Sequence, residues 1–399
     1  MIVTDHKDNL VTVTVYGELT LSDYKEFEAL VNDKVKSGGT VNLLCDLRQM
    51  AAFTLDVAWE DIKFERAHSH DFGKIAVLTD SQWVTWSAWL SQAFVDADLR
   101  VFRDEQEARD WLSSALERFT TLIDAADLAR HLQDADWRVF DCSFDLAHPH
   151  AGELAYREAH IPGAVYAHLE RDLAAPAGGG RGRHPLPDPA RLAAWLGEAG
   201  VGNGTQVVVY DDAGGTYAGR MWWLLRWLGH DAVALLDGGV GAWEAAGGAL
   251  TDAPSRPPRA VFTPHVRTDM TVDVGFVQTR LAEGGIRLLD ARNAQRFRGE
   301  NETQDPVGGH IPGAINRFFK DNLLPDGRFK SAAALRTEYA ALLDGRGAAQ
   351  VVNSCGSGVT ACHNLLAMEI AGLPGSRLYP GSWSEWCADP ARPIATTGP

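Results

Sequence analysis

A five-residue segment, HIPGA, occurs at residues 160–164 and again at residues 310–314 of this 399-residue chain. Two further pairs of segments match in the same order: 207–211 with 351–355, and 237–243 with 380–386. The offsets between matched segments lie between 143 and 150 residues, so the three matches are collinear. Collinear matches at a nearly constant offset indicate two copies of one domain.

The choice of basic residue changes along the chain. Residues 1–119 contain six lysines and six arginines, whereas residues 120–399 contain two lysines and 23 arginines. This shift indicates that a separate N-terminal unit precedes the repeats. Four prolines between Asp252 and Met270 predict a semi-rigid linker between the two copies. The predicted divisions of the chain are an N-terminal domain at 1–118, a first repeat at 122–252, a linker at 253–270 and a second repeat at 271–398.

All three predicted domains alternate strand and helix patterns, which indicates an α/β fold class. Each repeat is expected to form a parallel sheet flanked by helices, and the N-terminal domain a smaller α/β unit. In the second repeat the predicted strands are 287–290 and 350–354, and the predicted helices are 332–343 and 359–371. In the N-terminal domain the predicted strands are 10–16, 41–47, 74–79 and 99–102, and the predicted helices are 22–36, 54–68, 82–95 and 105–116.

Composition excludes several classes of protein. The net charge of −16 disfavours general binding to nucleic acid or to anionic membranes. No run of 18 apolar residues is present, so no transmembrane helix is expected, and the first residues lack a secretion signal. Five cysteines at scattered positions favour a reduced, cytoplasmic protein over a disulfide framework.

The segment that carries the clearest chemistry begins at Cys355. An apolar strand pattern ends there, a glycine-rich turn follows, and a helix pattern begins, in the order Cys355, Gly356, Ser357, Gly358, Val359, Thr360. Glycines allow successive backbone N–H groups to point toward one centre, and the start of a helix adds a positive dipole end. Both effects favour a thiolate, so Cys355 is predicted to be a nucleophile. A phosphate-binding Cys-x5-Arg loop is disfavoured, because Ala361 stands where the arginine would be.

The two HIPGA segments, the CGSGVT loop and the GSWSEW segment at 381–386 together resemble the tandem rhodanese family over about 122–398. The resemblance implies that Cys355 carries sulfane sulfur as a persulfide and passes it to a thiol, cyanide or thioredoxin-like acceptor. Asp211 stands in the first repeat where Cys355 stands in the second, so the first repeat is expected to be inactive. No metal and no organic cofactor is implied.

The loop sequence bears on the sulfur donor. Within the family, CGSGVT loops resemble 3-mercaptopyruvate sulfurtransferases, whereas loops with basic residues resemble thiosulfate enzymes. We therefore expect 3-mercaptopyruvate as donor, with thiosulfate:cyanide transfer as the alternative. A sulfur-sensing or partner-binding module that loads Cys355 without turnover is the alternative outside enzymes.

The same resemblance implies further site residues. Arg296 matches the arginine that anchors the donor, whereas Arg292 is expected to pair with a carboxylate and stays a second candidate. A second arginine expected before the repeated HIPGA is absent from 300–309, so Arg298 and Arg317 are candidates to replace it. Glu170 and His184 of the first repeat match a carboxylate–histidine pair. Together with Ser357 that pair is expected to relay a proton.

The N-terminal domain resembles a STAS-like (SpoIIAA-like) domain over most of 1–118 and shows no catalytic constellation. Trp83, Trp86 and Trp89 fall on one face of a predicted helix. Packing within the protein accounts for such a face, and a groove for an apolar ligand or a protein partner is the sharper alternative.

Overall fold

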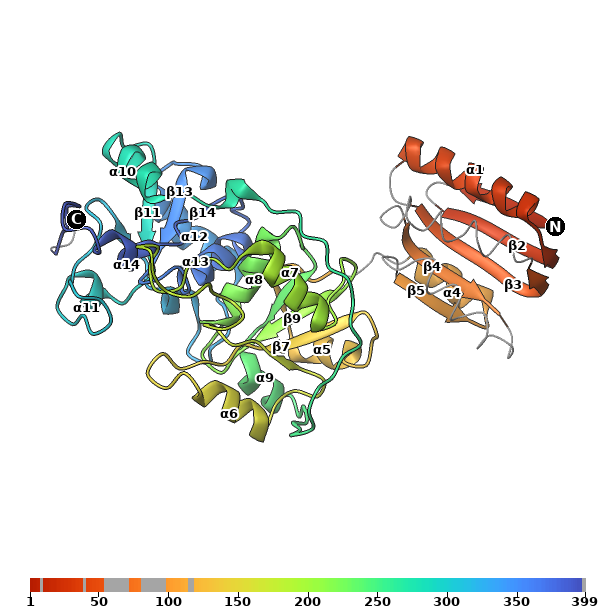
Figure 1. The fold of residues 1–399 in the computed structure, drawn as a ribbon, viewed down its shortest axis with the longest axis horizontal. Helices are drawn as coiled ribbons and strands as arrows, with labels where there is room; N and C mark the ends of the chain where they lie inside the picture. Colours follow the sequence, from red (N-terminus) through yellow and green to blue (C-terminus); the bar gives the residue numbers. More distant parts are fainter. Residues whose placement is uncertain (8–9, 39–40, 54–71, 80–97, 114–117, 397–399) are drawn as a thin grey trace. The chain divides into compact units, whose positions relative to one another are not determined.

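The computed structural model describes residues 1–7, 10–38, 41–53, 72–79, 98–113 and 118–396. The chain divides into two compact units, Met1–Glu117 and Arg118–Pro399 (Figure 1). The two repeats therefore lie in one unit, and the finer division of that unit at 253–270 stays a prediction. The helices predicted at 54–68 and 82–95, and with them Trp83, Trp86 and Trp89, lie outside the described residues.

The first unit contains a five-stranded sheet in the order β1-β2-β3-β4-β5, in which β1 and β2 are antiparallel and the other pairs are parallel. Its elements are β1 (Ile2–Lys7), β2 (Leu10–Leu19), α1 (Leu21–Gly38), β3 (Val41–Phe53), β4 (Phe72–Leu78), β5 (Asp98–Phe102) and α4 (Glu105–Ser113). Strand β3 extends six residues beyond the predicted end at 47, because its pairing with β2 continues to Phe53.

Strand periodicity explains how the two faces of this sheet are covered. In β2, Val11, Val13 and Val15 are buried in alternation and share a cluster with side chains of α1 such as Phe27. Leu112 of α4 belongs to a separate cluster. The unit therefore has two layers of apolar packing, one on each side of the sheet.

The first repeat contains a five-stranded sheet in the order β6-β10-β9-β7-β8, with every neighbouring pair parallel. Its strands are β6 (Leu122–Ile123), β7 (Trp137–Asp141), β8 (Val165–Tyr166), β9 (Gln206–Tyr210) and β10 (Val233–Leu236). Its helices are α5 (Ala125–His131), α6 (Ala151–Glu158), α7 (Pro189–Glu198), α8 (Ala218–Trp227) and α9 (Gly239–Ala245).

The second repeat contains a four-stranded parallel sheet in the order β12-β11-β13-β14. Its strands are β11 (Arg287–Asp290), β12 (Ile315–Asn316), β13 (Val351–Ser354) and β14 (Arg377–Leu378). Its helices are α10 (Val274–Ala282), α11 (Ala294–Phe297), α12 (Ala332–Leu343), α13 (Ala361–Ile370) and α14 (Ser382–Trp386), with short 3₁₀ turns at Thr268–Met270, Phe319–Asn322 and Ala348–Gln350. Strand β11 and helix α12 have the predicted bounds, whereas α13 begins two residues later than predicted.

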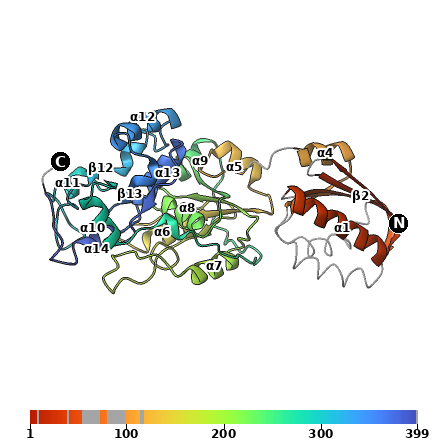
Figure 2. The same cartoon turned by 90° about the horizontal axis from the view of Figure 1, so that it is seen from above.

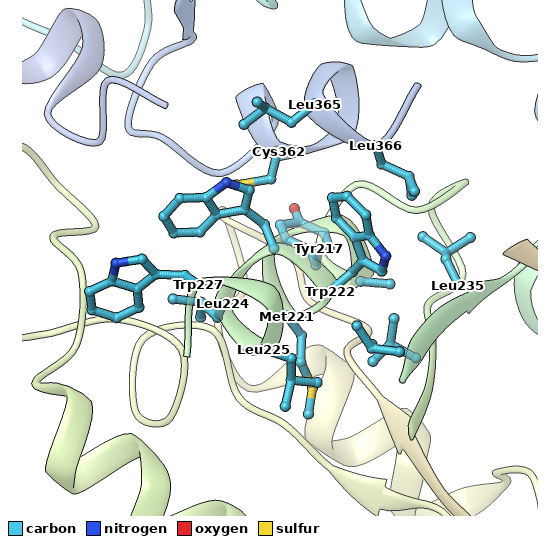
Figure 3. Close-up of a cluster of buried hydrophobic side chains, with 14 of the residues drawn as sticks. Tyr217, Met221, Trp222, Leu224, Leu225, Trp227, Leu235, Cys362, Leu365 and Leu366 are labelled. Carbon is cyan, nitrogen blue, oxygen red and sulfur yellow. The ribbon is translucent and has the colours of Figure 1, made fainter. Parts of the chain in front are cut away.

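Helices α8 and α13 join the two repeats (Figures 1 and 2). Nine of the ten residues of α8 are buried, and both helices contribute to one apolar cluster that spans the repeats. Figure 3 shows labelled side chains of α8 and α13 within this cluster, among them Trp222 and Leu366. Each helix follows the loop at the carboxyl end of a parallel strand, β9 or β13. Packing α8 against α13 therefore brings both loops to the boundary between the repeats. Among the helices in the described part of the chain, none is long and apolar enough to cross a membrane.

Candidate active site

Cys355 lies at the carboxyl end of β13, in the loop that leads into α13. Its side chain is 2% exposed, and the backbone N–H of Gly358 donates a hydrogen bond of 3.1 Å to its Sγ. Gly358 has a φ of +77°, and a Cβ there would collide with the carbonyl oxygen of Pro380. The loop is further held by Ser382, whose Oγ accepts from the N–H of Cys355 at 3.1 Å. The thiol is therefore fixed at a turn that only glycine forms easily.

The corresponding loop of the first repeat is filled by a carboxylate. Asp211 accepts four backbone hydrogen bonds of 2.8–2.9 Å, from the N–H groups of Ala213, Gly215, Tyr217 and Ala218. A carboxylate cannot take up sulfane sulfur, so this loop holds no nucleophile. It does show that the backbone at the strand–helix junction of this fold stabilises a negative charge.

A buried arginine connects the Cys355 loop to the first-repeat segment that contains His184. Arg220 of α8 is fully buried and bonds to carbonyl oxygens, including those of Gly358 at 3.0 Å and His184 at 3.3 Å. Burial lowers the pKa of Arg220, and the neighbouring sulfurs of Cys362 and Cys355 oppose that shift. Burial raises the pKa of Cys362 to about 12, which favours the thiol form at neutral pH.

His184 and Ser357 come from opposite repeats and form a hydrogen bond of 2.7 Å between Nδ1 and Oγ. Burial, followed by the charges of Arg220 and Arg183, lowers the pKa of His184 to about 4, so the imidazole is neutral at physiological pH. The carboxylate of Glu170 lies 3.7 Å from Nε2 and favours the tautomer with its proton there. Nδ1 then accepts the hydroxyl proton of Ser357.

A cavity of about 190 Å³ opens above Cys355 between the repeats. The second repeat contributes the loop residues Cys355, Gly356, Ser357, Val359 and Thr360 together with Ala291, Arg292, Asn293, Arg296, Gln304, Phe318 and Phe319. The first repeat contributes Leu146, Arg183, His184, Thr216 and Tyr217. The site is thus composite, and neither repeat alone encloses the sulfur.

Arg296, predicted to anchor the donor, lines this cavity. Its Nε and Nη2 bond to Glu302 at 3.0 and 2.8 Å, and its Nη2 also bonds to Asp305 at 3.2 Å. Although burial alone would raise the pKa of Glu302, the hydrogen bonds from Arg296 and from the backbone hold that pKa below its usual value. Arg296 is therefore held by an ionised carboxylate while its outer nitrogens face the loop.

Arg292 also touches the cavity, and its Nε and Nη2 are occupied, whereas its buried Nη1 has no hydrogen-bond partner among the described residues and lies 3.5 Å from Oε2 of Glu302. It bonds to both oxygens of the buried Asp290 and to the carbonyl oxygen of Gly309 at 2.7 Å, and it lies 4.8 Å from the ring centre of Trp383. This is the carboxylate pairing expected from the sequence. Arg292 ties β11 to the segments beside the nucleophile loop.

The two arginines considered as replacements for the missing one lie away from the cavity. Arg298 is bound to Glu300 at 2.7 Å on the surface, and Arg317 is bound to Asn322 and Glu338. Neither residue lines the space above Cys355. The additional arginine there is Arg183, next to His184, a residue that is not among the candidates predicted from the sequence. The only local signal for it was its position in the Gly-rich stretch that precedes His184.

Comparison with known proteins places these observations in a family. The SpoIIAA-like family model matches residues 10–113, and the rhodanese-like domain model matches residues 124–246 and 274–389. A protein of Pseudomonas aeruginosa named "Probable 3-mercaptopyruvate sulfurtransferase" is 52% identical over 277 residues, which cover 69% of this chain and 98% of the relative. The thiosulfate sulfurtransferase of Mus musculus is 36% identical over 62% of this chain and 84% of that protein.

A solved structure agrees with these matches. The 3-mercaptopyruvate sulfurtransferase from Leishmania major superposes with a TM-score of 0.62 at 30% identity, over 69% of this chain and 76% of that one. The two matches of the rhodanese-like domain model include both repeats and the loop that begins at Cys355. With two rhodanese-like repeats behind a SpoIIAA-like domain, the chain belongs to the rhodanese-like family of sulfurtransferases.

Proposed function

We propose that the protein takes sulfane sulfur from 3-mercaptopyruvate onto Cys355 and passes it to a thiol or cyanide acceptor. The observation that carries this proposal is that the cavity above Cys355 is cationic on one side and neutral on the other. Arg296 supplies N–H groups for a carboxylate on one side, and the neutral His184–Ser357 pair faces the reacting atoms on the other. The loop itself carries no cation.

In the first half-reaction the Cys355 thiolate attacks the donor sulfur. An S–S bond forms, the bond between that sulfur and C3 of the donor breaks, and its electron pair passes to the enolate of pyruvate. The thiol proton of the donor ends on C3, so pyruvate leaves and a persulfide remains. Ser357 and His184 are placed to relay this proton: Oγ of Ser357 accepts it from the donor thiol while the hydroxyl proton passes to Nδ1 of His184, and the reverse steps deliver a proton to C3, with Glu170 fixing the tautomer.

In the second half-reaction the acceptor attacks the outer sulfur of the persulfide. The S–S bond breaks, its electron pair returns to Cys355 as a thiolate, and the product is a persulfide of the acceptor thiol or thiocyanate. A thioredoxin-like protein with an exposed thiolate is a suitable acceptor. The backbone N–H of Gly358, which donates to Sγ of Cys355, stabilises the anionic sulfur throughout. Two successive half-reactions predict ping-pong kinetics.

The test is to measure kcat/KM for 3-mercaptopyruvate and for thiosulfate on the full-length protein, with cyanide as acceptor. We expect a preference for 3-mercaptopyruvate, and Cys355→Ser should abolish transfer from both donors. Cys362→Ser is the matched control, since a hydroxyl there can still donate to the carbonyl oxygen of Gly358, as the thiol does at 3.4 Å. Substantial transfer by Cys355→Ser would move the nucleophile elsewhere. A single loading of Cys355 without turnover would favour a sensing role.

Thiosulfate remains the second candidate donor, because Arg183 and Arg296 both lie near Gly356 and so bring cations to a loop that has none of its own. The relative from Mus musculus is named for that activity. A higher kcat/KM for thiosulfate in the same assay would replace our proposal with this one.

Two wider proposals rest on less specific features. The five cysteines are all free and buried, which suits a reducing, cytoplasmic location. A partner-binding or ligand-binding role for the SpoIIAA-like domain stays a prediction.

A further inference from the structure

Two guanidinium groups from opposite repeats meet above the residue that follows the nucleophile. A Cβ built on Gly356 would lie 2.9 Å from Nη2 of Arg183, and 3.4 and 3.6 Å from Nη2 and Nη1 of Arg296. Both arginines line the cavity above Cys355. A glycine at 356 therefore leaves the space in which the two guanidinium groups approach each other.

Both arginines retain N–H groups that can bind a ligand. Nη2 of Arg183 donates to Oε1 of Gln304 at 3.1 Å. Nη1 of Arg296 has no hydrogen-bond partner within the described part of the chain. Because each Nη atom carries two N–H groups, a donor is available on each side of the gap. Two donors that converge from different directions suit the two oxygens of a carboxylate.

One acidic side chain holds the pair together. The two oxygens of Asp305, a residue whose side chain is 2% exposed, bind Nη1 of Arg183 and Nη2 of Arg296. Glu302 binds Arg296 as well. Two carboxylates thus offset the charge of two guanidinium groups, so the gap offers directed N–H groups rather than excess positive charge. That arrangement suits a singly charged carboxylate better than the thiosulfate dianion.

Arg183 reaches this position through its backbone. Its N–H donates to Oγ of Ser384 at 3.1 Å. The preceding Gly182 has a φ of +85°, and a Cβ there would lie 2.7 Å from the carbonyl oxygen of Gly381. The first-repeat loop is therefore docked on the GSWSEW segment by main-chain contacts. Removing the side chain of Arg183 leaves those contacts in place.

We propose that Arg183 is a specificity-determining residue of the first repeat that binds the donor carboxylate together with Arg296. The inference deepens the proposed function and rests on it. The repeat without a nucleophile thereby supplies the second arginine that residues 300–309 lack, and Asp305 from that stretch acts as its positioning residue.

The experiment compares wild type with Arg183→Ala and Arg183→Lys. Arg181→Ala is the matched control, because Arg181 is exposed in the same loop and lines a different cavity. The readouts are kcat and KM for 3-mercaptopyruvate and for thiosulfate, and separately the rate at which preloaded Cys355 persulfide passes sulfur to cyanide. Losing one charge-assisted hydrogen bond predicts a KM for 3-mercaptopyruvate raised about tenfold to a hundredfold in Arg183→Ala.

The smaller change is expected in kcat, with the cyanide half-reaction unchanged, partial recovery in Arg183→Lys and no change in Arg181→Ala. A KM within twofold of wild type in Arg183→Ala would overturn the inference, as would an equal loss in the cyanide half-reaction, which would mean a structural role. Wild type that consumes only thiosulfate would refute the proposed donor instead. In that case a raised KM for thiosulfate in Arg183→Ala would show that Arg183 binds the donor but not through a carboxylate, and an unchanged KM would show that it binds no donor.

Discussion

Two glycines flank Ser357 in the active-site loop, and their surroundings differ. Gly358 has a φ of +77°, faces the carbonyl oxygen of Pro380, and uses its N–H to bind the sulfur of Cys355. Gly356 does not have a positive φ, and a Cβ there would meet the flexible ends of two arginines. Gly358 therefore determines the shape of the loop, whereas Gly356 leaves room for the guanidinium groups that Asp305 and Glu302 hold in place.

Alanine at each position should separate these effects. Gly358→Ala is expected to lower kcat at least a hundredfold and to destabilise the protein by about 1–3 kcal/mol, because left-handed backbone is strained for alanine. Gly356→Ala should leave the melting temperature nearly unchanged and raise the KM for the donor, because the arginine ends shift. Steady-state kinetics and thermal unfolding of both variants check this. Equal thermal destabilisation by the two substitutions would contradict it.

At the scale of elements, the strand–loop–helix unit occurs once around a thiol and once around a carboxylate. In the first repeat seven residues separate β9 from α8, and in the second six residues separate β13 from α13. In this longer loop, four backbone N–H groups from the loop and from the start of α8 donate to Asp211. The side chain of Asp211 fills this loop and accepts its N–H groups, so the loop supports α8 at the repeat boundary without any ligand.

Replacing Asp211 should lower the free energy of unfolding, because the residue takes no direct part in the sulfur transfer. Asp211→Ala leaves three buried N–H groups and the partly buried N–H of Ala213 without their acceptor, and we expect a loss of about 3–5 kcal/mol, as for a broken buried network. Asp212→Ala is the matched control, because Asp212 is exposed next to it and should change stability by less than about 0.5 kcal/mol. Urea unfolding of both variants measures the difference. Similar urea midpoints for the two variants would mean that the hydrogen bonds to Asp211 contribute little to stability.

At the scale of the whole two-repeat unit, three buried histidines connect stability to pH. Burial is the main cause that lowers the pKa of His184, His230 and His363 from 6.5 to about 4. The folded protein therefore keeps all three neutral between those values, whereas the unfolded chain protonates them. Because the unfolded state binds more protons in this window, stability is complete above pH 6.5 and falls as the pH drops toward 4.

Each of these histidines should remove roughly 3 kcal/mol over that window. Free energies of unfolding measured at pH 7, 6 and 5 should decrease accordingly. In His363→Gln the slope should become shallower by about one proton, whatever the absolute stability of the variant. Glutamine can replace the hydrogen bonds of His363 with Asn322 and Gly214. An unfolding free energy that does not change between pH 7 and 5 would contradict the prediction.

Much of the site could be predicted because its signals are local. Cys355 stands where an apolar strand pattern ends and glycines begin, and the expected pairing of Arg292 with a carboxylate is found with Asp290, two residues away in sequence. The late start of α13 has a local cause as well. Val359 and Thr360 belong to the loop that lines the cavity around the sulfur, so α13 begins only after them, at Ala361.

The duplication and the α/β class followed from the amino-acid sequence alone, and the glycine positions predicted Cys355 as the nucleophile and a first-repeat loop without a thiol, because repeats, periodicity and glycine positions act over a few residues. The tertiary structure decided which arginines share the cavity. Arg298 and Arg317 are nearer to Arg296 in sequence but bind other carboxylates, whereas Arg183 arrives from the opposite repeat. The physical reason is that α8 packs against α13 and docks the Arg183 loop on the second repeat, a contact between residues about 200 positions apart that no local pattern encodes.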